Sequence, residues 1–222
     1  MEIKEISTAL FDLDGVVFDT EPQYTEFWGS QCRLYHPEDP GLEYRIKGQT
    51  LVQILDHYFA TEKDEHAKII SRLDEFERNM KFEYVAGFEN FIDDLHRNGI
   101  NTAVVTSSNR AKMEVVYKAR PDFKNLFDAI LTSEDFERSK PDPDCYLKGA
   151  ARFGENDVRR CVVFEDSFNG LKSGQGAGMY VVGLSTTNSE DAIKPLADII
   201  IPDYKDLDCN KLINKLSFVD LK

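Results

Sequence analysis

The sequence contains no apolar run of about 18 residues, the length that lets a helix cross a bilayer, so we expect no transmembrane segment. Residues 1–10 include Glu2 and Glu5 in place of a basic stretch followed by an apolar one, and no signal peptide is expected. The 4 cysteines form no CxxC motif and no cluster with histidine, which predicts free thiols and no zinc site. These absences predict a cytoplasmic protein.

Positive charge is also scarce. The chain has 27 Lys and Arg residues against 40 Asp and Glu residues, which gives a formal net charge of −13 at pH 7. Such an excess of negative charge repels nucleic acids and anionic membranes, so neither is an expected partner. An anionic substrate therefore has to be held by positive charge concentrated at its binding site.

The composition is otherwise that of a globular protein, because 41% of the 222 residues are hydrophobic and 30% are charged. Strands are predicted at 7–13, 101–106, 129–132, 161–164, 180–183 and 198–201. Between and after them, helices are predicted at 88–98, 109–118, 167–176 and 211–216, and another helix begins at Pro143 with Asp142 as its cap. The alternation predicts an α/β fold, a doubly wound and mostly parallel sheet with helices on both faces.

Residues 21–84 interrupt this alternation and contain no convincing strand. Helices are predicted there at 23–34, 50–59 and 62–82, and Thr61 and Asp64 have the spacing of a capping box for the last one. We therefore expect two domains: an α/β core formed by residues 1–20 and 85–222, and an inserted all-helical cap formed by residues 21–84.

Polar residues follow the first four predicted strands. In chain order they are Asp12 and Asp14, Thr106 to Ser108, Lys140, and Glu165 with Asp166. Because the carboxyl ends of parallel strands meet at one edge of a sheet, where ligands bind, these side chains are expected to lie together. Each group alone also fits a structural role, as a turn, a helix cap or a solvated loop residue, but such roles do not explain their common position.

Four carboxylates so close together would raise one another's pKa and destabilise the fold, so a cation has to neutralise them. Ligands that are all oxygen atoms, with no cysteine or histidine, favour Mg²⁺ over zinc. A metal beside a lysine and a hydroxyl group is typical of a phosphate site, and a helix that starts near Ser108 would add backbone N–H groups to it.

The segment from Phe11 to Thr20, FDLDGVVFDT, resembles the first motif of the haloacid dehalogenase-like phosphotransferase superfamily. Thr106, the segment 140–144 and the segment 165–167 are similar to its other three motifs, and all four occur in order. The resemblance is strongest to the branch that contains β-phosphoglucomutase and sugar-phosphate phosphatases, in which a helical cap follows the first motif.

The resemblance implies a role for each matching residue. Asp12 is the nucleophile that becomes an aspartyl phosphate, and Asp14 is the general acid and then the general base. Thr106 binds the transferring phosphoryl group, and Lys140 neutralises it together with Asp12. The implied Mg²⁺ ligands are Asp12, the backbone carbonyl of Asp14, and Asp166, with Glu165 close to the metal or bound to it.

The cap is expected to choose the substrate. Trp28 lies where β-phosphoglucomutase has a tryptophan that faces the sugar, although a lone tryptophan is equally compatible with the core of the cap. The remaining candidate substrate-binding residues are Lys47, Gly48 and Gln49 of a cap loop, and Ser107, Ser108 and Asn109 after the second strand. Two positions depart from the mutase pattern, since Tyr24 replaces a histidine and Leu51 replaces the arginine that binds a second phosphate.

These observations favour a Mg²⁺-dependent phosphatase that works as a monomer. Its expected partner is a small phosphorylated metabolite such as a sugar phosphate. A β-phosphoglucomutase-like phosphomutase is the alternative, and the departures at Tyr24 and Leu51 count against it. In a mutase, Lys47 or Arg110 would have to replace the missing arginine. A phospho-acceptor signalling domain is a remote alternative, because such domains have about half this length and no helical insert.

Overall fold

The sheet is continuous and parallel. The computed structural model describes residues 6–219, and its six strands have the order β3-β2-β1-β4-β5-β6, with every neighbouring pair parallel. The strands are β1 (Thr8–Phe11), β2 (Asn101–Val105), β3 (Ala129–Leu131), β4 (Cys161–Glu165), β5 (Tyr180–Leu184) and β6 (Ile199–Ile201). The predicted doubly wound α/β fold is confirmed.

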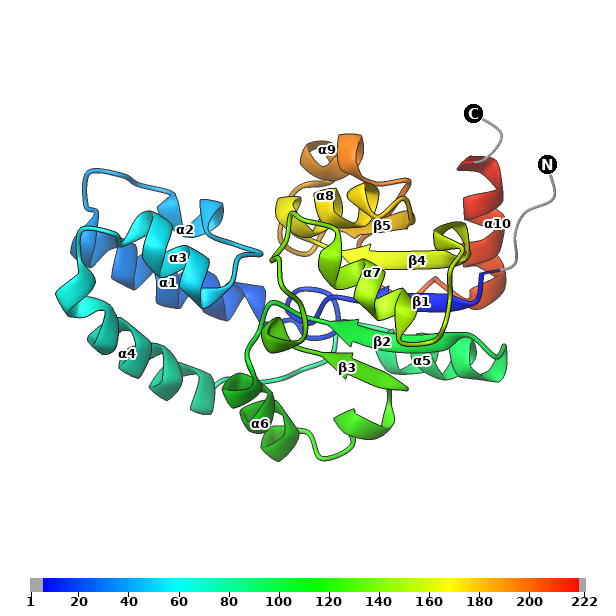
Figure 1. The fold of residues 1–222 in the computed structure, drawn as a ribbon, viewed down its shortest axis with the longest axis horizontal. Coiled ribbons are helices and arrows are strands. Elements are labelled where there is room, and N and C mark those ends of the chain that lie inside the picture. Colours follow the sequence, from blue (N-terminus) through cyan, green and yellow to red (C-terminus); the bar gives the residue numbers. More distant parts are fainter. Residues whose placement is uncertain (1–5, 220–222) are drawn as a thin grey trace.

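Ten α-helices surround or extend from this sheet within the described residues (Figure 1). They are α1 (Glu21–Tyr35), α2 (Leu42–Arg45), α3 (Leu51–Tyr58), α4 (His66–Arg78), α5 (Phe88–Arg97), α6 (Arg110–Ala119), α7 (Asp144–Ala151), α8 (Phe168–Gly176), α9 (Glu190–Ile193) and α10 (Cys209–Val219). None of the helices in the part of the chain that the structure describes is both long enough and apolar enough to cross a membrane.

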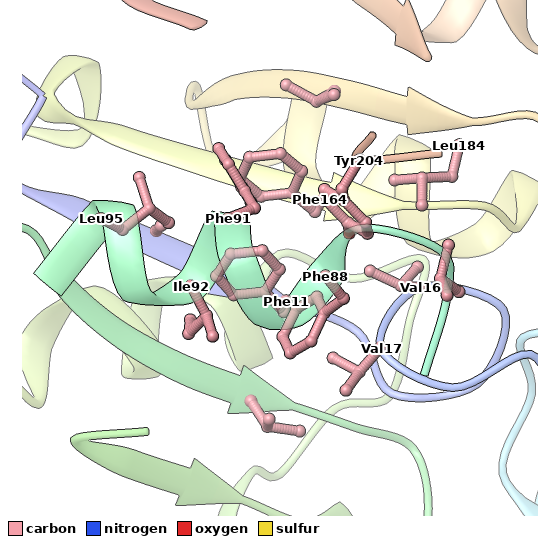
Figure 2. Packing of buried hydrophobic residues seen from close by; sticks show 14 of the residues in the cluster. Phe11, Val16, Val17, Phe88, Phe91, Ile92, Leu95, Phe164, Leu184 and Tyr204 are labelled. Carbon is pink, nitrogen blue, oxygen red and sulfur yellow. The ribbon is translucent and has the colours of Figure 1, made fainter. Parts of the chain in front are cut away.

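One face of the sheet packs on α5, α6 and α10 through a core rich in aromatic rings. The ring of Phe11 on β1 stacks on Phe164 of β4, with centroids 4.5 Å apart, and meets the edge of Phe88 at 5.7 Å. Phe91, one turn after Phe88 on α5, also packs against Phe164 (Figure 2). All four side chains are at most 1% exposed, so the middle of the sheet is held firmly on this side.

The opposite face packs on α7 and α8. Successive residues of a strand point to opposite faces, so Leu10 and Val105 face away from Phe11 and contact this second layer. Tyr146 of α7 is fully buried there. Because both faces are covered, the strands are continuous apolar runs, which is the pattern that made β1 and β4 recognisable in the sequence.

Helices α1 to α4 form a separate layer beyond the carboxyl ends of the strands, toward which the strand arrows point in Figure 1. They have a hydrophobic cluster of their own, centred on Phe59, Trp28 and Ile69. The capping box that starts α3 is complete, because the Thr50 hydroxyl accepts from the backbone N–H of Gln53 and the Gln53 side chain accepts from that of Thr50.

The helix predicted at 62–82 is wrong in extent. A short 3₁₀ helix, η1 (Lys63–Glu65), precedes α4, and the predicted capping box is absent because the Thr61 hydroxyl donates to the Glu62 carboxylate instead. At the other end the chain leaves the helix after Arg78. The cause is a tertiary contact, since the side chain of Gln23 on α1 bonds both the N–H and the carbonyl of Lys81.

The predicted start of α7 is also wrong. Pro143 occupies the N-cap position and the helix begins at Asp144, so Asp142 is not the cap. The Asp142 carboxylate instead accepts from the N–H of Asp144 at 3.0 Å. Asp144 in turn accepts from the backbone N–H groups of Glu137 and Arg138, which ties the loop that carries Lys140 to the start of α7.

Candidate active site

Adjacent strands bring three carboxylates together. Phe11 at the end of β1 pairs with Phe164 of β4, so the residues that follow them meet at the same edge of the sheet. Asp12, Glu165 and Asp166 each place a carboxylate oxygen within 4.8 Å of the others. Glu165 and Asp166 are buried, and Asp12 is half-buried. The arrangement expected from the strand ends is therefore present for three of the four carboxylates, and Asp14 lies outside this group.

Lys140 lies at the centre of these carboxylates. Its Nζ donates to Asp12 Oδ1 at 2.5 Å, to Glu165 Oε1 at 2.7 Å and to the carbonyl of Val105 at 3.1 Å. The side chain is 1% exposed, so water does not screen this charge. A lysine from the loop after β3 thus reaches the sheet centre and neutralises part of the acidic cluster.

Glu165 is saturated by hydrogen bonds from the protein. Its Oε1 accepts from the Tyr146 hydroxyl at 2.8 Å in addition to Lys140. Its Oε2 accepts from the backbone N–H groups of Asp166 and Ser167 and from the Ser167 hydroxyl. The structure therefore gives Glu165 the task of orienting Lys140 and the turn after β4, and leaves it little capacity to bind a metal.

Burial among like charges shifts the pKa of the remaining carboxyls upward. Burial, opposed by Lys140 and assisted by Glu165, raises the pKa of Asp12 to about 7. Burial raises the pKa of Asp166 as well, and the nearby Glu21, Glu165 and Asp12 add to it. A cation beside Asp12 and Asp166 would lower both pKa values, and their donor atoms, all carboxylate oxygens, fit Mg²⁺.

The turn after β1 requires glycine. Gly15 has φ +75°, and a Cβ there would lie 2.2 Å from Asp166 Oδ2, so this backbone passes directly beside the carboxylate. The Thr186 hydroxyl donates to the Gly15 carbonyl at 2.6 Å, and the Thr187 hydroxyl donates to Asp166 Oδ2. The loop after β5 therefore holds both the turn after β1 and the Asp166 carboxylate in place.

Asp14, the fourth carboxylate expected in the cluster, is not part of the group formed by Asp12, Glu165 and Asp166, and it is held by a different set of partners. Its Oδ1 accepts from the Thr20 hydroxyl at 2.6 Å, and its Oδ2 accepts from the Ser108 hydroxyl at 3.3 Å. Lys112 Nζ makes a short ion pair with the same Oδ2 and lies 4.6 Å from the centre of the Tyr24 ring. The Tyr24 hydroxyl donates to Glu77 at 2.8 Å, which joins α1 to α4 within the cap. The contact of Lys112 with the Tyr24 ring links the cap to the core.

Lys112 was missed by the sequence analysis. It stands in the first turn of α6, a helix predicted correctly, but its charge enters no motif and its partner Asp14 is 98 positions earlier. The available signal was the helical period, because residues three and four positions apart share one face. Asn109 caps this helix through a bond from the Lys112 N–H, so the lysine lies one turn into a helix that starts at the site.

The segment after β2 lies at the same place. The Thr106 hydroxyl oxygen accepts from the N–H of Ser108 at 3.0 Å, which leaves its hydrogen free to be donated to a ligand. Ser107 Oγ is buried and has no hydrogen-bond partner among the described residues. The two hydroxyl groups are therefore the polar atoms here that a bound phosphate can satisfy.

A cavity of about 590 Å³ separates these residues from the cap. The predicted residues that line it are Asp12, Asp14, Trp28, Lys47, Gly48, Gln49, Thr106, Ser107, Ser108, Asn109 and Asp166. Lys140 and Glu165 do not line it, because they are buried behind Asp12. The cavity is large enough for a small metabolite.

The cap residues differ in how free they are. Trp28 is 6% exposed and packs against Phe27 in the hydrophobic cluster of the cap, so it belongs to that core as well as to the cavity wall. Gln49 donates to the Tyr58 hydroxyl at 2.9 Å. Lys47 forms an ion pair of 2.8 Å with Glu21.

The loop that carries Lys47 approaches the core closely at Gly48. This glycine has φ +73°, and a Cβ there would lie 2.4 Å from Ser167 Oγ. A side chain at this position would push the cap away from the turn after β4. The glycine therefore permits the closed arrangement of the cavity.

Neither Leu51 nor Arg110 can supply a positive charge for a second phosphate in the cavity. Leu51 lines the cavity but offers no charge. Arg110 is exposed and pairs with Asp135, and it does not line the cavity. The predicted substitution of Arg110 for the missing arginine is therefore not supported by its position.

Comparison with known proteins agrees with the motifs. The profile of the haloacid dehalogenase-like hydrolase family matches residues 6–178. Hexitol phosphatase A of Escherichia coli is 30% identical over 183 residues, which are 79% of this chain and 82% of that protein. The bifunctional riboflavin kinase/FMN phosphatase of Arabidopsis thaliana is 26% identical over 220 residues, or 94% of this chain, and the match spans 56% of that longer protein.

A solved structure gives the same result for the fold. β-Phosphoglucomutase from Clostridium difficile matches with a TM-score of 0.76 at 22% identity, over 98% of this chain and 100% of that one. At this identity the match shows a shared fold alone. The predicted resemblance to the superfamily is confirmed by the sequence profile and the relatives.

The raised pKa of Asp12 predicts how stability depends on pH without metal. The folded protein keeps this proton until about pH 7, whereas the ordinary value is 3.8, so the folded state binds more protons between these values. The free energy of unfolding of the metal-free protein therefore decreases as pH rises through this window, by an amount that is smaller in Asp12→Asn. Urea unfolding in EDTA at several pH values measures this difference.

Saturating Mg²⁺ should remove most of the decrease, because it binds the ionised carboxylates of the folded state. A wild-type curve that runs parallel to that of Asp12→Asn across the window would contradict the role given to burial at Asp12.

Proposed function

Because the chain belongs to the haloacid dehalogenase-like hydrolase family, we propose that it is a Mg²⁺-dependent phosphatase that hydrolyses a small phosphorylated metabolite, a sugar phosphate, through an aspartyl-phosphate intermediate. The observation that carries the proposal is the buried ammonium group of Lys140, 2.5 Å from an Asp12 carboxylate that faces the cavity. The relative named hexitol phosphatase A supports a phosphorylated sugar or polyol as the substrate class.

The donor set fits a hard cation. We propose that Asp12, the backbone carbonyl of Asp14, and Asp166 hold Mg²⁺, while Glu165 stays with Lys140. When bound, Mg²⁺ supplies positive charge that offsets the charge of the phosphoryl oxygens. The raised pKa values of Asp12 and Asp166 support this assignment, since both carboxyls have a deficit of positive charge around them.

The residues divide the chemistry between two steps. Asp12 forms a bond from a carboxylate oxygen to phosphorus while the bond from phosphorus to the leaving oxygen breaks, and Asp14 gives that oxygen its proton. A water molecule then gives a proton to Asp14 and displaces Asp12, releasing phosphate. The Thr106 hydroxyl binds the phosphoryl oxygens during both steps, and Lys140 supplies positive charge to Asp12 and to those oxygens from behind Asp12. Positioning and positive charge provide most of the catalysis.

A phosphomutase is the second candidate, because a β-phosphoglucomutase shares the fold. A mutase has to hold a second phosphate during its cycle, and an unpaired dianion is costly to bury. Leu51 offers it no charge, and the Tyr24 hydroxyl is bonded to Glu77. No observation favours a signalling phospho-acceptor, and the cavity under the cap supports an enzyme that encloses its substrate.

We further propose that the protein acts in the cytoplasm as a monomer and does not bind nucleic acid or membranes. The net charge of −13 supports the proposed lack of binding to nucleic acid and membranes, since anionic polymers and lipid surfaces are repelled by it.

Replacing the nucleophile tests the proposal. Asp12→Asn keeps the shape of the side chain but removes the nucleophilic charge, so hydrolysis of p-nitrophenyl phosphate with Mg²⁺ should fall by about 10³-fold or more. Circular dichroism and thermal unfolding serve as controls for the fold. Activity within about tenfold of wild type would remove Asp12 from this role.

The proposed metal ligands can be separated from the general acid. Asp14→Asn should slow both the formation and the hydrolysis of the phosphoenzyme, yet change Mg²⁺ affinity less than Asp166→Asn does, because only the backbone of Asp14 binds metal. Calorimetric Mg²⁺ titrations of the two variants make the comparison. Equal and large losses of affinity would overturn the assignment of Asp14.

The products distinguish a phosphatase from a mutase. With β-glucose 1-phosphate and Mg²⁺ we expect net release of phosphate, with no acceleration by added glucose 1,6-bisphosphate. The reason is that, among the described residues, both lysines that line the cavity are already paired with carboxylates. Coupled assays for phosphate and for glucose 6-phosphate measure both products. Conversion to glucose 6-phosphate much faster than phosphate release would establish the mutase instead.

A further inference from the structure

The charge of the cavity wall bears on which phosphate esters can enter. Two lysines line the cavity, Lys47 and Lys112, and the lining carboxylates outnumber them. The lining carboxylates are Asp12, Asp14, Glu21, Glu43, Asp74, Glu77, Glu134, Glu137 and Asp166. The phosphoryl end of a substrate meets Asp12 and the proposed metal, with the charge of Lys140 behind them, but the rest of the substrate faces the other lining groups.

Neither lining lysine is available as a free cation. Lys47 and Glu21 form an ion pair of 2.8 Å in which each side chain is 11% exposed. Lys112 pairs with Asp14, and these side chains are 5% and 15% exposed. A substrate anion that took Lys47 would leave the nearly buried Glu21 without its partner. One that took Lys112 would leave the ionised form of Asp14, and Glu77 on which the same charge acts, without that positive charge, which is strongly unfavourable.

The cap side of the cavity adds three further carboxylates, those of Glu77, Asp74 and Glu43. Glu77 accepts from the Tyr24 hydroxyl, and burial raises its pKa, a shift that the nearby charge of Lys112 opposes and the charges of Asp14 and Asp74 assist. Asp74 lies one turn earlier on α4, and Glu43 lines the cavity from α2. Within residues 6–219, neither Asp74 nor Glu43 forms an ion pair. The wall opposite the acidic cluster is therefore negative as well.

We propose that this cavity is a charge filter, which accepts phosphate monoesters whose alcohol carries no second anion and which favours an alcohol bearing an ammonium group. The proposal rests on the proposed phosphatase function and specifies its substrate class. Bisphosphates and phosphorylated carboxylic acids are rejected, because their second anion meets Glu77, Asp74 and Glu43 and finds both lysines already paired. A neutral sugar is tolerated, and an amino sugar gains from the same field.

Three pyranose phosphates that differ in one group test the filter. Glucosamine 1-phosphate, glucose 1-phosphate and glucuronate 1-phosphate are compared as substrates with Mg²⁺ and as competitors of p-nitrophenyl phosphate hydrolysis. Relative to glucose 1-phosphate, we expect the glucuronate ester to bind and react at least about tenfold less well, and the glucosamine ester severalfold better.

A single substitution links this order to the cap. Glu77→Gln keeps an oxygen that accepts from Tyr24 but removes one negative charge, so the kcat/KM ratio of the glucuronate ester to the glucose ester should rise severalfold. Glu114→Gln is the matched control, because Glu114 is exposed on α6 and does not line the cavity. The control should leave that ratio unchanged.

The outcomes separate the two proposals. If all three esters react and compete equally, the enzyme is a phosphatase but the charge filter is wrong. The same conclusion follows if Glu77→Gln and Glu114→Gln have the same kcat/KM ratio of the glucuronate ester to the glucose ester. If neither these esters nor p-nitrophenyl phosphate is hydrolysed with Mg²⁺, the phosphatase function fails and the charge filter fails with it.

Discussion

The site depends on one constraint, which is that carboxylates crowded at the ends of β1 and β4 need positive charge beside them. Parallel pairing of Phe11 with Phe164 forces Asp12 toward Glu165 and Asp166. Lys140 supplies one charge from within the protein, and its burial prevents water from weakening it. Negative charge remains in excess, as the raised pKa of Asp12 and of Asp166 reflects, and it would favour a divalent cation beside these carboxyls.

The surrounding fold serves this constraint in layers. The aromatic core on one face and α7 on the other fix β1 and β4, so the acidic residues cannot move apart to relieve their repulsion. Tyr146 and the turn after β4 satisfy Glu165, which keeps Lys140 aimed at Asp12. The cap then closes the cavity and, in our account, chooses among substrates by charge.

Much of the fold was predictable from the sequence, because strands and helices have characteristic spacings of apolar residues. The sheet and the acidic edge followed from apolar runs that end in polar residues, and Asp12, Glu165 and Asp166 lie together as parallel strands place them, whereas Asp14 lies outside this group. Tertiary contacts were not predictable. The hydrogen bonds between Gln23 and the backbone of Lys81 end α4 before the predicted residue 82. The ion pair of Lys112 with Asp14 joins residues that are 98 positions apart. Neither contact has a local signature.

The central claim is that Asp12 carries the phosphoryl group between its transfer from the substrate and its release by water. Acid quenching during hydrolysis of a phosphate ester with Mg²⁺, followed by peptide mass spectrometry, tests this directly. The account predicts a mass increase of one phosphoryl group on the peptide that contains Asp12, which is lost at alkaline pH as expected for an acyl phosphate and is absent from Asp12→Asn. Turnover with no phosphorylated peptide in the quenched protein, or with the phosphoryl group on another residue, would contradict it.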